Sequence, residues 1–258
     1  MKRMINAAAL LILVFIFVLQ ATAKAGECHW YCIRTKGNKQ PPIPCEFSFI
    51  EEHDGYFIDR KHSDSNTDKV VYLTFDAGYE NGNVARVLDT LKKENVPAAF
   101  FILSHLVNAN ADLVLRMVEE GHLVCNHTAH HPNLWDAPKE RVQEEIKALE
   151  AAFKNLTGKD MSPYFRPPEG SFSRKMLQHV SALGYKTVFW SFAYADWDND
   201  KQPGREKALK TIFDNMHNGA VILLHPTSRT NADILPEIIA RLRADGYRFG
   251  TLEELCEP

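Results

Sequence analysis

Short apolar runs alternate with amphipathic stretches along most of this chain, and that alternation limits its fold more than any other feature. The runs are VVYLTF, AAFFIL, GHLVCN, KTVFW, AVILLHP and YRFGTL, which begin at residues 70, 98, 121, 186, 220 and 247. They lack a two-residue alternation of apolar and polar side chains, so both faces of each predicted strand are expected to be buried. Between them the spacing predicts amphipathic helices at 84–94, 111–121, 139–155, 174–183, 206–216 and 232–244.

Strand and helix alternate about six or seven times, which is typical of a parallel sheet covered by helices. The pattern therefore predicts an α/β fold, as a closed or nearly closed (β/α) barrel. A chain of 258 residues can form such a barrel as one large domain. A doubly wound open sheet is the alternative, although no glycine-rich phosphate loop follows the first strand.

The N-terminus has the pattern of an export signal. Basic residues at positions 2 and 3 precede an apolar run over 5–19, and the small residues of ATAKAG follow it. Residues 1–25 are therefore predicted to be a signal peptide, and the rest of the chain is expected to work outside the cytoplasm. Because the apolar run is barely long enough to cross a bilayer, an uncleaved membrane anchor is the alternative.

Residues 26–68 are polar, are interrupted by KGNKQPPIP, and contain most of the cysteines. We predict that they form an extension lying across the main domain of residues 69–258, not a domain of their own. Cys125, within a predicted strand, is interpreted as a small buried apolar residue. The other four cysteines, at positions 28, 32, 45 and 256, could form two disulfides in any of three pairings, and a zinc knuckle or a reduced, unpaired set is the alternative.

Most of the chemically suggestive side chains fall where a predicted strand gives way to its loop. They are Asp76, His127, Arg166, Asp196 and His225. In a (β/α) barrel such positions converge on one rim, where these folds build active sites. His127 and His131 would also face one side if NHTAHHP coils into a helical turn, and imidazole is the commonest ligand of transition metals. A solvated histidine-rich loop is the alternative for that segment.

The motifs TFDAG, HTAHH, RPPEG, DW and LLH occur in an order that resembles the polysaccharide deacetylase family, also called the NodB-homology or carbohydrate esterase family 4. The resemblance covers residues 69–255 and implies a distorted (β/α) barrel of about seven strands. Longer segments around these motifs are most similar to the sporulation branch of the family. They are TFDAGYENG, RPPEGSFS, GYKTVFWSFAYADW and LLHPTSRTNADIL. The enzymes of that branch deacetylate muramic acid on the way to the muramic δ-lactam of spore cortex.

The resemblance also implies roles for single residues. Asp76 matches the catalytic base that takes a proton from water, and Arg166 matches the residue that orients it. His225 matches the general acid that protonates the departing amine, and Asp196 the carboxylate that raises the pKa of that histidine. The backbone N–H of Glu169 matches an oxyanion donor, while Trp197 and Leu223 would form apolar walls for the substrate. Alone, each could be an ordinary turn, surface or core residue.

The resemblance implies that His127 and His131 bind a divalent metal such as zinc, which would polarise the acetamide and activate water. The family's usual TFDDG has a second aspartate that completes the metal site, and Ala77 stands there in this chain. Because Ala77 offers no ligand atom, we predict weak metal binding by the two imidazoles. Glu80 and Asn81 are close enough in sequence to offer a substitute oxygen.

The sequence thus predicts an exported hydrolase that removes N-acetyl groups from N-acetylmuramic acid in peptidoglycan. A glucosamine deacetylase of peptidoglycan or chitin, or an acetyl-xylan esterase, is the enzymatic alternative. The non-enzymatic alternative is a protein that binds wall glycan on a decayed deacetylase scaffold. The formal charge of −3 and the lack of a basic stripe argue against nucleic acid as a partner.

Overall fold

The computed structural model describes residues 26–257, and its centre is a curved sheet of eight strands. All pairs within the sheet are parallel. Its strands are β2 (Gly55–Tyr56), β3 (Lys69–Ala77), β4 (Ala99–Ile102), β5 (Leu123–Asn126), β6 (Ser162–Phe165), β8 (Lys186–Val188), β9 (Ala220–Leu224) and β10 (Tyr247–Phe249). Parallel strands buried on both faces explain why the runs are apolar throughout.

β3 is long enough to pair with three strands. It pairs with β10 along Lys69–Val71, with β9 along Val71–Phe75 and with β4 along Thr74–Ala77. The sheet then curls until the segment after β8 reaches β9, where Phe192 forms an isolated bridge to Ile222. Closure by a bridge, without a full ladder, makes this a distorted barrel. The barrel prediction is thus confirmed, and the doubly wound alternative is wrong.

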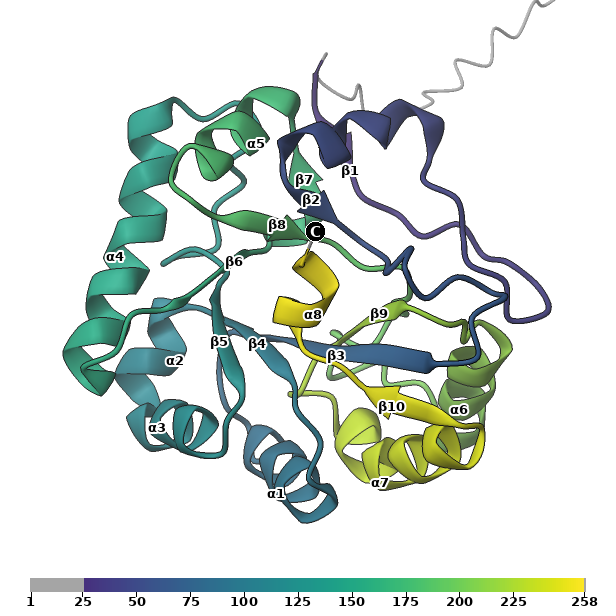
Figure 1. Cartoon of the computed structure of the whole chain (residues 1–258). Coiled ribbons are helices and arrows are strands. Elements are labelled where there is room, and N and C mark those ends of the chain that lie inside the picture. Colours follow the sequence, from purple (N-terminus) through teal and green to yellow (C-terminus); the bar gives the residue numbers. More distant parts are fainter. Residues whose placement is uncertain (1–25, 258) are drawn as a thin grey trace, which may run out of the picture.

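Helices surround the outside of the curved sheet (Figure 1). They are α1 (Val84–Glu94), α2 (Ser104–Ala109), α3 (Ala111–Glu119), α4 (Lys139–Thr157), α5 (Arg174–Ser181), α6 (Arg205–Asp214) and α7 (Arg229–Ala244). Each of the longer helices turns its apolar stripe to the sheet, as Val142, Ile146 and Leu149 of α4 show by their complete burial. The last helix, α8 (Leu252–Cys256), packs instead against strand side chains that point to the inside of the curved sheet, such as Val70 and Tyr72.

Successive residues of β3 point to opposite sides of the barrel wall. Val70 and Tyr72 lie in the inner cluster with Leu252 and Leu255 of α8, which closes one end of the barrel. Val71, Leu73, Phe75 and Ala77 lie in the outer cluster against the helices. Asp76 follows the inward set at the carboxyl end of β3, so the inner surface at that end is where a site can form.

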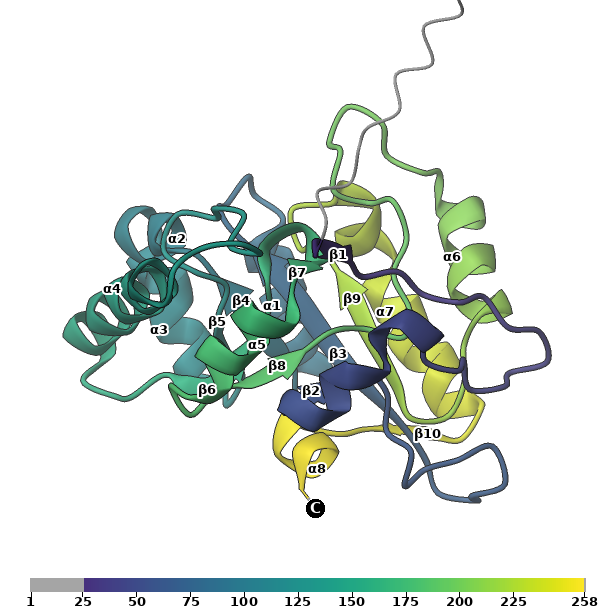
Figure 2. The same cartoon turned by 90° about the horizontal axis from the view of Figure 1, so that it is seen from above.

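Residues 26–68 add secondary structure that the sequence pattern does not reveal. The 3₁₀ helix η1 (Cys45–His53) precedes β2, which joins the main sheet beside β8. β1 (Cys28–His29) pairs antiparallel with β7 (Ser171–Phe172). Figure 2 shows this segment running across the barrel near β7 and β8. Trp30 anchors it, since its ring packs among Phe47, Phe57, Phe172 and Phe189.

The predicted signal peptide, residues 1–25, lies outside the described residues. Over residues 26–257 no helix combines the length and the apolar character needed to cross a bilayer. The five cysteines are all free in the same range, so the two expected disulfides are not found. Cys125 is buried as predicted, and Cys256 lies in the same inner cluster.

Candidate active site

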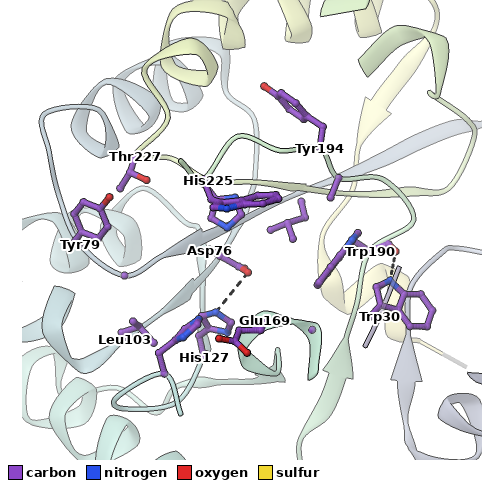
Figure 3. Close-up of a pocket in the computed structure, with 16 residues that line it drawn as sticks. Trp30, Asp76, Tyr79, Leu103, His127, Glu169, Trp190, Tyr194, His225 and Thr227 are labelled. Atoms are coloured by element: carbon purple, nitrogen blue, oxygen red, sulfur yellow. Dashed lines mark hydrogen bonds and ion pairs between the residues drawn. The ribbon is translucent and has the colours of Figure 1, made fainter. Parts of the chain in front are cut away.

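A cavity of about 630 Å³ opens at the carboxyl ends of the barrel strands. Seven of the nine residues predicted for the site line it, and Arg166 and Asp196 lie directly behind. The lining residues are Trp30, Asp76, Gly78, Tyr79, Leu103, His127, His131, Glu169, Gly170, Trp190, Ala193, Tyr194, Trp197, Leu223, His225 and Thr227. Figure 3 shows Asp76 between His225 and His127. The chain therefore brings residues separated by some 150 positions into one site.

Arg166 holds the carboxylate of Asp76 from inside the barrel. Its Nη1 donates to Asp76 Oδ1 at 2.8 Å. Its Nε donates to the carbonyl of Val188 at 2.9 Å, and Nη2 donates to Thr74 Oγ1 at 3.0 Å. The guanidinium also lies 4.1 Å above the ring of Phe101. A fully buried guanidinium with this many partners has one allowed position, which fixes the carboxylate as well.

Asp76 is kept ionised by its surroundings. Burial by itself would raise the pKa of Asp76, but the charge of Arg166, followed by those of His127 and His225, outweighs burial and lowers it. The second carboxylate oxygen, Oδ2, lies 3.7 Å from His127 Nε2. The side chain is about a tenth exposed, so this oxygen is available to the cavity.

His127 follows β5 and is oriented by the neighbouring strand. Its Nδ1–H donates to the carbonyl of Arg166 at 2.8 Å, which leaves Nε2 toward Asp76 and the cavity. Burial first, then the charge of His131, lowers the pKa of His127 to about 4 against the opposing effect of Asp76. Near neutral pH the ring is therefore uncharged, with a free lone pair on Nε2, as a metal ligand or an acceptor requires.

His131 reaches the same cavity through a loop. The segment does not coil into a helical turn, since Thr128 and His131 both have left-handed backbone angles, φ 73° and φ 59°. The hydroxyl of Thr128 accepts from the N–H of His131 at 2.9 Å, and Asn126 Oδ1 accepts from the N–H of Thr128 at the same distance. This tight turn places the rings of His127 and His131 5.0 Å apart.

His225 directly follows β9 and lies on the side of Asp76 that is opposite to His127. Its Nδ1–H donates to Asp196 Oδ1 at 2.7 Å, and its backbone N–H donates to Asp196 Oδ2 at 2.9 Å. Burial lowers the pKa of His225, but the hydrogen bond and charge of Asp196 more than offset this and raise it overall. Asp196 is almost fully buried, and Asn231 of α7 also donates to it. The nitrogen left for the cavity is Nε2.

The remaining predicted residues also line the cavity. Glu169 lies in the 3₁₀ turn η2 (Pro168–Gly170) with a left-handed backbone, φ 59°. Trp197 is 61 % exposed, and its ring centroid lies 6.2 Å from that of His225. Leu223 is buried in β9. An exposed indole at a cavity mouth is available for a ligand, whereas Leu223 contributes a small apolar wall.

Four aromatic residues of the cavity were missed by sequence reasoning: Trp30, Tyr79, Trp190 and Tyr194. Trp190 ends a predicted strand, and Tyr79 directly follows TFDAG, so their positions relative to the motifs could have indicated them. Trp30 gave no such signal, because it belongs to the polar extension and reaches the cavity only through the fold. Figure 3 shows Trp30 and Trp190 side by side, joined by a hydrogen bond.

A third ligand that would complete a metal site beside His127 and His131 is not found among residues 26–257. Over residues 26–257 no three His, Cys, Asp or Glu side chains form a group that could hold a metal ion. Ala77 is fully buried in the outer cluster. Glu80 does not replace it, because its carboxylate accepts from the backbone N–H groups of Gly82 and Val84 at the start of α1. Asn81 bonds the carbonyl of Thr227. Neither residue therefore adds a ligand beside His127 and His131, the pair that the sequence predicts to bind metal.

The chain matches the polysaccharide deacetylase family over residues 63–188. It is 38 % identical over 239 residues to the peptidoglycan-N-acetylmuramic acid deacetylase PdaA of Bacillus subtilis, with 92 % of this chain and 89 % of that protein covered. The solved structure of PdaA, a family 4 carbohydrate esterase, superimposes with a TM-score of 0.83 and 37 % identity. That match covers 89 % of this chain and 96 % of PdaA, so it extends past residue 188.

Two further proteins are similar. A family 4 carbohydrate esterase from Bacillus anthracis has a TM-score of 0.70 and 34 % identity, over 88 % of this chain and 98 % of that one. The peptidoglycan-N-acetylglucosamine deacetylase PgdA of Listeria monocytogenes is 33 % identical over 195 residues, which are 74 % of this chain and 40 % of that protein. The match to the Bacillus anthracis esterase covers most of both chains, whereas the match to PgdA covers less than half of PgdA.

Proposed function

Because the chain belongs to the polysaccharide deacetylase family, we propose that it hydrolyses the N-acetyl group of N-acetylmuramic acid in peptidoglycan glycan strands. The products would be acetate and a free amine on the sugar. Similarity to PdaA along nearly the whole length supports this choice of substrate. The observation that carries the proposal is the placement of Asp76 between His127 and His225 in one cavity.

Asp76 is the general base. Its lowered pKa keeps it ionised at neutral pH, so it can accept a proton from the attacking water. The water oxygen then bonds to the acetamide carbon, and the carbonyl π electrons move to the oxygen. Arg166 is a positioning residue, since its bond to Oδ1 leaves Oδ2 as the proton acceptor.

His225 is the general acid. Asp196 accepts a hydrogen bond from Nδ1–H and raises the pKa of the ring, which favours the form that carries a proton on Nε2. When the tetrahedral intermediate collapses, the C–N bond breaks and that proton passes to the amine nitrogen. His127, with its pKa of about 4, cannot supply this proton at neutral pH. The two histidines therefore have different roles because their surroundings shift their pKa values in opposite directions.

Glu169 and two apolar residues bind the substrate. The left-handed backbone of Glu169 supports a role for its N–H as donor to the negative oxygen of the intermediate. Trp197 would stack on the face of a sugar ring, and Leu223 would contact the acetyl methyl group. An aromatic platform is a common way to bind the apolar face of a pyranose.

His127 and His131 are proposed to hold a divalent metal, zinc or a similar ion, weakly. Bound there, the metal would polarise the acetamide carbonyl and favour deprotonation of water. The neutral ring of His127 and its fixed tautomer suit a ligand, since its Nδ1–H is already bound to a carbonyl. Weak binding is expected because a third protein ligand is missing among the described residues.

We further propose that the protein is exported and acts in the cell wall, as part of spore cortex synthesis. The N-terminal pattern of residues 1–25 and the wording of the motifs support this. In a spore-forming cell the place of action would be the forespore envelope. Retention of the N-terminal segment would associate the enzyme with the membrane.

The test is acetate release from purified glycan strands without stem peptides, followed by mass spectrometry of the product sugars. A free amine on muramic acid, or its δ-lactam, is the expected result. A free amine on glucosamine alone would overturn the choice of sugar and leave a deacetylase. Binding of glycan without any acetate release, with metal supplied, would overturn the enzymatic proposal in favour of a wall-binding protein.

A further inference from the structure

Residues 27–34 of the N-terminal extension, here called the strap, cross three of the loops that build the cavity. At one end Glu27 Oε1 accepts from Asn133 Nδ2 and from Ser171 Oγ, both at 3.0 Å. At the other end the guanidinium of Arg34 donates to the carbonyl of Ala193. The strap thus touches the loop after His131, the turn that contains Glu169, and the segment after β8.

Trp30 is the centre of the strap and holds two of these loops by hydrogen bonds. Its backbone N–H donates to the carbonyl of Gly170 at 2.8 Å. Its indole Nε1–H donates to the carbonyl of Trp190, also at 2.8 Å. The ring is only 6 % exposed and stacks on Phe189, with centroids 4.6 Å apart. The backbone N–H and the buried indole N–H would each lose a partner if Trp30 moved, so this residue is a rigid support for both loops.

The turn that Trp30 supports has little freedom. Glu169 and Gly170 both have left-handed backbone angles, φ 59° and φ 63°. A Cβ atom on Gly170 would lie 2.9 Å from Trp190 and 3.3 Å from Trp30 Cβ, so the turn is packed directly between the two tryptophans. A left-handed backbone is costly at a residue other than glycine, such as Glu169, unless its surroundings hold it. The direction of the Glu169 N–H therefore depends on this packing.

We propose that Trp30 is a positioning residue for catalysis. It fixes the positions of the Glu169 N–H and of Trp190, which both line the cavity, relative to the acetamide group of the substrate. This inference rests on the proposed function. It assigns a catalytic purpose to the extension, whose sequence carries none of the family motifs. The effect would fall on turnover more than on binding, because an oxyanion donor acts on charge that develops in the transition state.

The test is Trp30→Phe in the full chain, assayed for acetate release from glycan strands. Phenylalanine keeps an aromatic ring against Phe189 and removes the indole N–H. We expect kcat to fall about five- to tenfold, the size of one neutral hydrogen bond, while KM changes less than about twofold. A wild-type kcat in the folded variant would overturn the inference.

Leu177→Ala is the matched control, because Leu177 is buried in the same apolar cluster but lies on α5 and does not line the cavity. It should lower the melting temperature and leave kcat unchanged well below that temperature. If Trp30→Phe does not fold, Glu27→Ala tests the inference instead, because it removes the hydrogen bonds at one end of the strap. Its kcat should fall about threefold. Unchanged kcat in that variant would count against the strap. Absence of acetate release by the wild type would instead reject the proposed function itself.

Discussion

The guanidinium of Arg166 lies inside the barrel, and its Nη1 is 2.8 Å from Asp76 Oδ1. Arg166 is completely buried, whereas Asp76 is about a tenth exposed at the floor of the cavity. A buried cation stabilises the ionised carboxylate, which explains the lowered pKa of Asp76 despite its burial. The same bond occupies Oδ1 and directs Oδ2 to the cavity. The proposed mechanism depends on this pair, because only an ionised and oriented carboxylate can act as the base.

Replacing Asp76 by Asn is therefore expected to remove activity without unfolding the protein. The amide oxygen can still accept from Arg166, but it cannot take a proton from water. Acetate release should fall by on the order of 10²–10⁴-fold. The far-ultraviolet circular dichroism spectrum should stay that of the wild type. Asp214→Asn, an exposed site at the end of α6, is the control and should retain full activity.

The pH dependence of kcat should follow Asp76 and His225. Asp76 must be ionised, and its pKa is lowered, so activity should be lost in acid only below the ordinary carboxyl value of about 4. His225 must be protonated, and its pKa is raised, so activity should decline in base only above the ordinary imidazole value of about 6.5. Initial rates between pH 3 and pH 10 measure both limits.

Asp196→Asn should move the alkaline limit to lower pH. The substitution removes the charge that raises the pKa of His225, and burial, which lowers it, then dominates. Asp198→Asn is the matched control, because Asp198 is two residues away and substantially exposed. An alkaline limit that stays in place in Asp196→Asn would show that His225 is not the acid.

The hydrogen-bonded pair of Asp196 and His225 should also make the stability of the fold depend on pH. The pKa of His225 is higher in the folded protein than in the unfolded chain, so its protonation stabilises the fold. This contribution is complete below about pH 6.5 and is lost as the pH rises through the folded-state value. Urea unfolding measures the free energy of unfolding at pH 5.5 and at pH 9. Between these two values it should fall by more in the wild type than in Asp196→Asn.

The barrel could be predicted from the sequence because its strands are apolar on both faces and its helices are regularly amphipathic. α1 covers Val84–Glu94 as predicted, and all four of its apolar stripe residues are buried. β2 could not be predicted, since Gly55–Tyr56 is too short to carry a periodic pattern and is a strand only because β8 lies beside it. Local pattern therefore identifies the barrel but not the segments that the barrel itself orders.

The site divides in the same way. Polar residues at strand ends, such as Asp76 and His225, could be predicted to converge because parallel strands end on one rim. The loop conformation that brings His131 to the cavity could not be predicted. It depends on two left-handed residues, Thr128 and His131, and an apolar pattern does not encode such backbone angles. Trp30 could not be predicted either, because its partners Gly170 and Trp190 lie at least 140 positions away.

Weak metal binding by the two imidazoles predicts a clear response to chelators. Dialysis against a chelator should remove the metal and lower acetate release, and zinc should restore it. His127→Ala and His131→Ala should both lose zinc binding in calorimetric titration. His130→Ala is the matched control, since that ring lies beside Glu145 and does not line the cavity. Full activity of metal-stripped protein would reject a metal requirement.

Gly170→Ala should be the most damaging glycine substitution at the cavity. Its φ of +63° is unfavourable for alanine, and the new Cβ would lie 2.9 Å from Trp190 Cη2. Gly158→Ala separates the two effects, because Gly158 has a φ of +71° and nothing within 4 Å of the added Cβ. Backbone strain alone should cost Gly158→Ala about 1–2 kcal/mol in urea unfolding.

The free energy of unfolding of Gly170→Ala should fall by about 1–3 kcal/mol more than that of Gly158→Ala, because the added Cβ overpacks a turn next to Trp190, whose backbone carbonyl is fixed by the indole N–H of Trp30. Gly170→Ala should also lower kcat, since displacing the turn redirects the Glu169 N–H. Gly158→Ala, at the end of α4 and outside the cavity, should retain the wild-type kcat. Equal losses of stability and equal kcat in the two variants would mean that the turn is not packed tightly between the tryptophans.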